Sequence, residues 1–205
     1  MGGFSVRWIF TSTMQWILAS ASPRRKELLA GLIENFDIIP SLADENLEGE
    51  FTPEGLVKAL AELKAKEVAL RPENMGKMVI GSDTVVAFDG KVLGKPKDEA
   101  DAFRMLKMLS GKAHAVYTGV CFARKDGDGY SADVRAEKTE VYFEALTDEW
   151  IMDYIRGGSP MDKAGAYGIQ DGGLVRKIEG SYTNVVGFPV ELVKEMMKDV
   201  GGDHD

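Results

Sequence analysis

The stretch from residue 16 to residue 32, WILASASPRRKELLAGL, predicts a strand, a loop and a helix in direct succession. The apolar run that starts at Trp16 ends in small residues, which is typical of a short buried strand. Ser22 is a suitable N-cap for the helix, and Pro23 stands in the first helical position, where its missing N–H costs nothing. Strands that alternate with helices in this way predict an α/β fold.

The loop of this unit carries four polar side chains, those of Ser20, Ser22, Arg24 and Arg25. Backbone N–H groups and the positive end of the helix dipole would add to the two guanidinium groups in attracting an anion. The same residues would occur if a Ser-Pro cap simply began an ordinary helix and both arginines were solvated. The loop therefore predicts a phosphate site only in combination with other signals.

Strand and helix patterns alternate along the rest of the chain. Strands are expected at residues 36–41, twice within 77–96 with a hairpin at Asp89-Gly90, and at 113–125, 136–146 and 174–180. Helices are expected at residues 53–71, 98–111, 146–158 and 189–200. The apolar stripe of the first of these helices is expected to consist of Leu56, Leu60, Leu63 and Val68. Together these elements predict an α/β fold with a mixed central sheet flanked by helices.

Length and composition favour one globular unit of 205 residues. We expect a single domain at residues 15–200, preceded by an N-terminal extension (1–14) and followed by a flexible tail (201–205). The net charge of −8 argues against a partner that is polymeric nucleic acid. The single Cys121 rules out an intramolecular disulfide and favours the cytoplasm, and no apolar run approaches the roughly 18 to 20 residues of a membrane span.

A second chemical signal is the tetrad Gly81-Ser82-Asp83-Thr84, expected at the end of an apolar strand. A carboxylate there could bind Mg²⁺ or accept a proton from water, although for the tetrad alone an Asp in a turn, with Thr84 beginning the next strand, is slightly favoured. Glu45, Lys64 and Lys95 are further candidates, because phosphoanhydride cleavage needs acidic metal ligands and cations that offset phosphate charge.

The third signal is the glycine-rich segment DKAGAYGIQDGG, residues 162–173. Tyr167 could line a base pocket or pack on the core, and Gln170 offers both a donor and an acceptor. His114 and His204 stand apart from any catalytic pattern, so we interpret His114 as a strand residue. The chain lacks the G-x-x-x-x-G-K-[ST] motif of P-loop nucleotide hydrolases.

Seven blocks of the sequence resemble, in order, those of the Maf family of septum-formation-inhibitor-like nucleoside triphosphate pyrophosphatases. They are LASASPRRKELL, LAELKAKEVA, IGSDTVV, LGKPKDEADA, YTGV, DKAGAYGIQ and GSYTNVVGFP. The resemblance extends from about Trp16 to Val200. It departs from the family at Ser82, where Ala is frequent, and in the first fourteen residues.

The resemblance implies a fold related to inosine triphosphate pyrophosphatases, with two lobes around a nucleotide cleft, commonly as a homodimer. It implies that Asp83 and Glu45 are catalytic acids that bind a divalent cation, Mg²⁺ or Mn²⁺. The phosphate contacts that it implies are Ser20, Arg24, Arg25, Lys64 and Lys95. Arg24, Thr84 and Gln170 match positions linked to substrate choice.

The combination of SPRR, SDT and AYGIQ resembles the branch of the family that hydrolyses dTTP and UTP, or modified pyrimidine nucleotides, to the monophosphate and pyrophosphate. Two alternatives remain open at this point. One is the same reaction on 7-methyl-GTP or another purine nucleotide. The other is a nucleotide-binding regulator of cell division that does not hydrolyse its ligand.

Overall fold

The computed structural model describes residues 14–201 of the chain. All but the last residue of the expected extension, and all but the first of the expected tail, lie outside the described residues. The strands are β1 (Trp16–Leu18), β2 (Asp37–Ile38), β3 (Met78–Phe88), β4 (Lys91–Leu93), β5 (Ala113–Asp126), β6 (Gly129–Phe143) and β7 (Val175–Glu179). The α-helices are α1 (Pro23–Ala30), α2 (Pro53–Ala69), α3 (Glu99–Leu109), α4 (Asp148–Arg156), α5 (Tyr182–Val186) and α6 (Val190–Gly201). Short 3-10 turns are η1 (Pro72–Asn74), η2 (Ser159–Asp162), η3 (Ala164–Ala166) and η4 (Ile169–Asp171).

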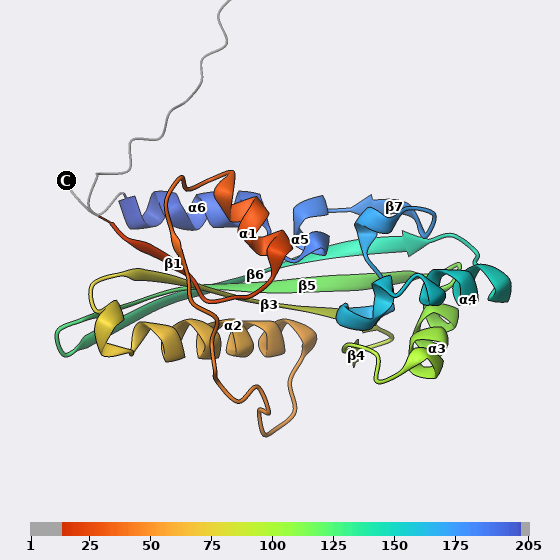
Figure 1. Ribbon diagram of the computed structural model, residues 1–205, viewed down its shortest axis with the longest axis horizontal. Coiled ribbons are helices and arrows are strands. Elements are labelled where there is room, and N and C mark those ends of the chain that lie inside the picture. The colour runs from red at the N-terminus through yellow and green to blue at the C-terminus, as the bar shows by residue number, and fades with distance from the viewer. Residues whose placement is uncertain (1–13, 202–205) are drawn as a thin grey trace, which may run out of the picture.

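All seven strands belong to one sheet in the order β2-β1-β3-β5-β6-β7, with β4 paired to β3 outside this path. The pairs β1–β2 and β1–β3 are parallel, whereas β3, β5, β6 and β7 pair antiparallel with their neighbours. The expected mixed sheet flanked by helices is therefore confirmed (Figure 1).

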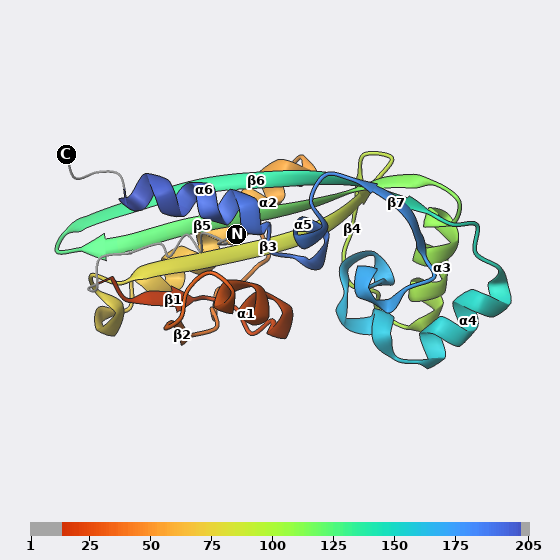
Figure 2. The same ribbon diagram turned by 90° about the horizontal axis from the view of Figure 1, so that it is seen from above.

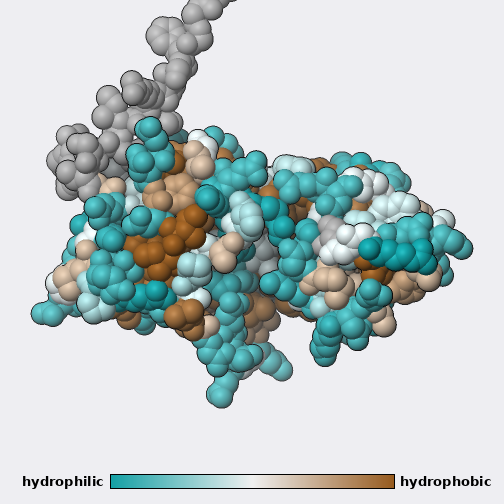
Figure 3. All heavy atoms as spheres, in the orientation of Figure 1, coloured by the Kyte–Doolittle hydropathy of each residue, from teal (hydrophilic) through white to brown (hydrophobic). Residues whose placement is uncertain are grey.

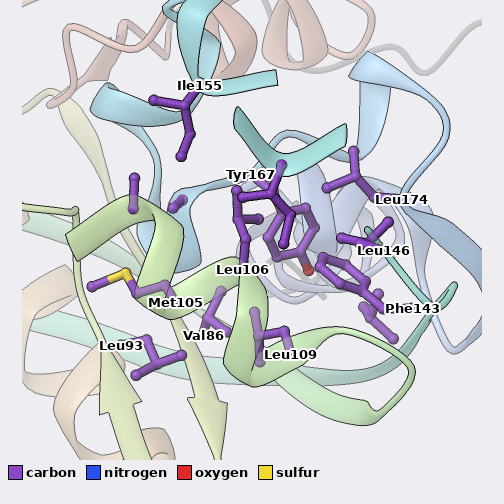
Figure 4. Packing of buried hydrophobic residues seen from close by; sticks show 14 of the residues in the cluster. Val86, Leu93, Met105, Leu106, Leu109, Phe143, Leu146, Ile155, Tyr167 and Leu174 are labelled. Atoms are coloured by element: carbon purple, nitrogen blue, oxygen red, sulfur yellow. The ribbon is translucent and has the colours of Figure 1, made fainter. Parts of the chain in front are cut away.

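Two ends of the elongated molecule have separate hydrophobic cores, and β3, β5 and β6 run through both (Figures 1 and 2). At one end, α1 and α6 pack on one face of the sheet, while α2 covers the other face. At the other end, α3, α4 and the 3-10 turns η2 and η3 enclose a cluster around Leu106 and Phe143 (Figure 4). The expected arrangement of two lobes is confirmed, and each lobe is built on the same three strands.

Helix α2 lies unusually close to the sheet because glycines face it. A Cβ atom on Gly81 of β3 would stand 2.2 Å from the carbonyl oxygen of Ala61, and one on Gly119 of β5 would stand 2.2 Å from that of Val57. The expected apolar stripe was wrong in part: Leu56 and Leu63 are only half-buried. The buried face holds mainly small side chains, at Val57, Leu60, Ala61, Ala65, Val68 and Ala69, since larger ones would hold the helix away from the sheet.

Strand β3 changes partners along one of its edges. Its residues 78–80 pair with β1, its residues 86–88 pair with β4, and the five residues between them have no strand partner on that edge among the described residues. Asp83 was expected at the end of a strand, and this was wrong, because β3 continues to Phe88 and pairs Asp83 with Gly119 of β5. The neighbouring parallel strand β1 ends at Leu18, which pairs with Ile80, so β1 does not reach the level of Asp83. We call residues 81–85 the open edge of β3.

The first helix begins at its expected cap, Ser22, and two further helices begin in the same way. Ser22, Thr52 and Thr147 each accept a hydrogen bond from the backbone N–H three residues later, which satisfies a donor at the helix N-terminus. Helix α5, within the block GSYTNVVGFP, was not expected from the sequence. No helix in the part of the chain that the structure describes is long and apolar enough to cross a bilayer.

Candidate active site

A cavity of about 740 Å³ lies over the open edge of β3, between the two lobes. The surface is visibly hollowed between the two ends of the molecule (Figure 3). Its volume is in the range of sites that hold a nucleotide-sized ligand. The side chains singled out from the sequence all line it: Ser20, Ser22, Arg24, Arg25, Glu45, Lys64, Asp83, Thr84, Lys95 and Gln170.

Lys64 joins the two predicted acids. Its Nζ atom lies 2.7 Å from Oδ1 of Asp83 and 3.0 Å from Oε2 of Glu45. The Lys64 and Asp83 side chains are 12% and 13% exposed, whereas Glu45, in the loop before α2, is 55% exposed. The ammonium and Asp83 are therefore held in the floor of the cavity, and Glu45 approaches them from its rim.

The described residues contain no cluster of three or more His, Cys, Asp or Glu side chains suited to a metal ion. Two carboxylates that converge on one point are nevertheless what a magnesium site associated with a phosphate ligand requires. Mg²⁺ commonly takes one or two carboxylates from the protein and completes its octahedron with phosphate oxygens and water. Asp83 and Glu45 fit this requirement, and a bound ion would compete with Lys64 for them.

The Arg25 side chain forms hydrogen bonds with three segments of the protein, namely the loop before α1, strand β3 and the residue after α5. Its Nε donates to the carbonyl oxygen of Gly187 at 2.9 Å, and its Nη1 donates to the carbonyl of Ser82 at 2.9 Å. Nη1 also donates to Oγ of Ser20 at 3.3 Å, and Nη2 donates to Oγ1 of Thr84 at 3.2 Å. Burial lowers the pKa of the guanidinium, and the Asp83 carboxylate acts in the opposite direction.

These four bonds use four of the five N–H donors of the guanidinium. The bond to Ser82 satisfies a backbone carbonyl on the open edge of β3, where a neighbouring strand would otherwise donate. Arg25 thus has a structural role that the sequence did not indicate, and at most a small part of its hydrogen-bonding capacity faces the cavity.

Arg24 and Lys95 differ from Arg25. Both line the cavity, and neither side chain has a hydrogen bond or ion pair with another described residue. The pKa of Asp162 is lowered, mainly by its hydrogen bond from Lys163 and to a smaller extent by the positive charge of Arg24. Lys95 is exposed in the loop after β4. Their cationic groups are free to meet an anionic ligand.

Thr84 and Gln170 come from opposite walls of the cavity. Thr84 lies on the open edge of β3, and its Oγ1 is 2.9 Å from Oγ1 of Thr118 on the paired strand β5. Gln170 is exposed in η4 and lines the cavity from the other lobe.

Tyr167 contacts the cavity but belongs mainly to a core. It is 5% exposed, and its ring packs edge-on against Phe143 with 4.7 Å between centroids (Figure 4). Its hydroxyl lies 2.7 Å from Nε2 of His114. Burial lowers the pKa of His114 to about 4, so this imidazole is neutral near neutral pH. Of the two interpretations of Tyr167, core packing describes most of the side chain, and His114 is a buried strand residue as expected.

Sequence reasoning missed several residues of the site. Asp162 and Lys163 line the cavity and form an ion pair of 2.9 Å, and the block DKAGAYGIQ that contains them was the available signal. Gly187 supplies the carbonyl that Arg25 binds, with a φ of 113° that favours glycine. Thr118 lies beneath Thr84 and is fully buried. The block YTGV contains Thr118, but its position beneath Thr84 follows only from the pairing of β3 with β5.

The fold and the site together define a two-lobed α/β protein with a charged cleft at a switch of strand partners. A likeness to a solved structure supports the fold: the Ham1 protein of Staphylococcus aureus superimposes with a TM-score of 0.51 at 12% identity, covering 91% of this chain and 99% of that chain. The model of the family described as Maf-like protein matches residues 15–200. The chain belongs to the Maf family.

Two curated relatives are similar over most of their length. A dTTP/UTP pyrophosphatase of Thermococcus gammatolerans is 52% identical over 179 residues, which cover 86% of this chain and 92% of that protein. A dTTP/UTP pyrophosphatase of Geotalea uraniireducens is 49% identical over 187 residues, which cover 90% of this chain and 94% of that protein.

Proposed function

We propose that this protein hydrolyses dTTP and UTP to the nucleoside monophosphate and pyrophosphate. The observation that carries the proposal is the open edge of β3, where a buried Asp83–Lys64 pair and free cations surround one cavity. The relatives at 49% and 52% identity are named for this reaction, which supports its assignment to the same cavity here.

The cations of the cavity would hold the triphosphate. Arg24 and Lys95, which have no partner among the described residues, would bind phosphate oxygens at the start of α1 and at the opposite rim. Hydrogen bonds between such cations and phosphate are stronger than those between neutral groups. Ser20 would add a hydroxyl beside the helix N-terminus, where the dipole favours negative charge.

Asp83 would accept the proton of the attacking water. The water oxygen forms a bond to the α-phosphorus, the bond from that phosphorus to the bridging oxygen breaks, and pyrophosphate leaves with the electron pair. Lys64 fixes the position of the Asp83 carboxylate through the 2.7 Å contact. Catalysis of this kind depends mainly on positioning and on the neutralisation of charge.

Asp83 and Glu45 would hold a divalent cation, Mg²⁺ or Mn²⁺, together with phosphate oxygens. When bound, the cation supplies charge neutralisation on the phosphates and polarises the scissile group. Lys64 contacts both carboxylates, so its ammonium would lose at least one of these two contacts when the cation binds.

The test is a panel of purified-protein assays with dTTP, UTP, CTP, GTP and 7-methyl-GTP in Mg²⁺ and in Mn²⁺. Pyrophosphate and monophosphate should appear in equal amounts from dTTP and UTP, at a higher kcat/KM than from the other nucleotides. Preference for 7-methyl-GTP or GTP would reject the pyrimidine assignment. Binding of any of these nucleotides without turnover would reject hydrolysis and favour a regulator.

A further inference from the structure

Thr84 Oγ1 belongs to a row of three hydrogen bonds that runs from Arg25 through Thr84 and Thr118 to the carbonyl group of Asn184. Arg25 Nη2 lies 3.2 Å away, and Thr118 Oγ1 lies 2.9 Å away. Thr118 Oγ1 in turn lies 2.9 Å from the carbonyl oxygen of Asn184 in helix α5. Thr118 and Asn184 are fully buried, whereas Thr84 is half-buried and lines the cavity.

The direction of these hydrogen bonds follows from counting protons. A carbonyl oxygen only accepts, so the contact with Asn184 must use the one hydroxyl proton of Thr118. Thr118 can then only accept from Thr84, which uses the one hydroxyl proton of Thr84. An arginine N–H only donates, so Thr84 accepts from Arg25. This is the one assignment that places a proton in each of the three contacts.

Thr84 therefore has no proton to offer a ligand. Its oxygen has two acceptor positions, of which Arg25 uses one, and the other remains for a group in the cavity. Phosphate oxygens of a metal-bound triphosphate accept hydrogen bonds and cannot supply such a proton. The group that Thr84 accepts from must carry its own N–H or O–H.

We propose that Thr118 is a positioning residue that keeps Thr84 an obligate acceptor, and that Thr84 thereby accepts a hydrogen bond from N3–H of uracil or thymine. The inference rests on the proposed function and deepens it. Uracil and thymine share the N3–H donor, whereas N3 of cytosine is an acceptor and would face the lone pair of Thr84. Two acceptors in contact are unfavourable, so cytosine nucleotides are disfavoured. Sugar hydroxyls can donate or accept and would not distinguish these bases.

The first experiment compares Thr118→Val with Thr118→Ser and the wild type. Valine removes the acceptor below Thr84, so the Thr84 proton can turn to the cavity, while the Asn184 carbonyl keeps its bond from the Gly187 N–H at 3.0 Å. The ratio of kcat/KM for UTP to that for CTP should fall about tenfold in Thr118→Val, the size of one hydrogen bond. Thr118→Ser retains the hydroxyl and should keep the wild-type ratio within about twofold.

An equal loss of activity on both nucleotides in Thr118→Val, or an unchanged ratio, would mean that Thr118 is merely structural and would overturn the proposal. Thermal melting of the three proteins checks that they are folded.

A second measurement needs no variant. Wild-type protein should hydrolyse 3-methyluridine triphosphate at least tenfold less efficiently than UTP, because the methyl group replaces the N3 proton. Equal turnover of the two would overturn the proposal even if Thr118→Val does not fold. If the wild type hydrolyses no nucleotide, the proposed function fails separately. Calorimetric binding of UMP, CMP and 3-methyl-UMP then decides whether N3–H is recognised.

Discussion

The ammonium of Lys64 reaches the carboxylate of Asp83 at 2.7 Å across the interface between helix α2 and strand β3. This contact depends on how closely the helix lies on the sheet. Gly81 and Gly119 leave room for the helix backbone, so a lysine one turn further along can meet an aspartate on the strand below. The contact between Lys64 and Asp83 in the cavity therefore depends on the close packing of α2 against the sheet.

Replacing Asp83 by asparagine should remove hydrolysis and keep the fold. The amide has nearly the same shape but cannot accept a proton from water, so kcat should fall by about 10² to 10⁴. Pyrophosphate release from dTTP and UTP measures the effect. Asp128→Asn, in the exposed turn between β5 and β6, is the matched control and should keep full activity. An Asp83→Asn protein with wild-type turnover would disprove the catalytic role.

Gly119→Ala should destabilise the protein strongly. The added methyl would stand 2.2 Å from the carbonyl oxygen of Val57, which is backbone and cannot turn aside, so α2 must shift. We expect a loss of about 3 kcal/mol or more in the free energy of unfolding. Urea titration followed by circular dichroism measures it. Gly94→Ala is the control, since a methyl there meets nothing within 4 Å; equal stability of the two variants would contradict the close packing.

Arg24 and Arg25 should respond differently to alanine substitution. Arg25→Ala leaves the Ser82 and Gly187 carbonyls without the donor they have now, and we expect a loss of about 2 kcal/mol in stability. For a chain of this length the midpoint of melting should fall by about 4–8 °C. Arg24→Ala should leave the melting temperature unchanged and raise KM for the nucleotide. Equal melting temperatures of the two variants would contradict the stabilising role of the Arg25 hydrogen bonds.

His114 should make stability depend on pH below neutrality. Burial holds its pKa at about 4, below its ordinary value of 6.5, so between these values the unfolded chain binds a proton that the folded protein does not. Stability should therefore fall as the pH falls through this window, by about 1.4 kcal/mol per pH unit. Between pH 6.5 and 5, the wild type should lose about 2 kcal/mol more than His114→Gln. Urea unfolding at the two pH values measures this loss. An equal loss of unfolding free energy in the wild type and in His114→Gln would contradict the role of His114.

Much of the fold could be predicted because its signals are local. The caps at Ser22, Thr52 and Thr147 are set by a few neighbouring residues, and so is the Asp89-Gly90 hairpin between β3 and β4. The candidate residues of the site other than Glu45 could also be found as a set, since ordered blocks contain them, whereas Glu45 lies in the polar loop between two blocks. The structure brings all of them to one cavity, while their individual roles stay predictions until they are measured.

What the sequence did not predict depends on contacts between distant segments. Asp83 lies within a long strand, and only the end of the partner β1 places it at an edge. Arg25 is indistinguishable from Arg24 in sequence, and their difference comes from Gly187, which is 162 residues away. Local patterns contain no information on such partners.

Three continuous strands, β3, β5 and β6, pass from one hydrophobic core to the other. Enzymes that close over a ligand by rotating whole domains do so at a few loop or element-terminal residues that absorb the change in backbone angles. A hydrogen-bonded sheet offers no such hinge between these lobes. We therefore expect the cavity to be preorganised, so that substrate and product pass its rim, where the loop before α2 carries Glu45, without a rotation of one lobe against the other.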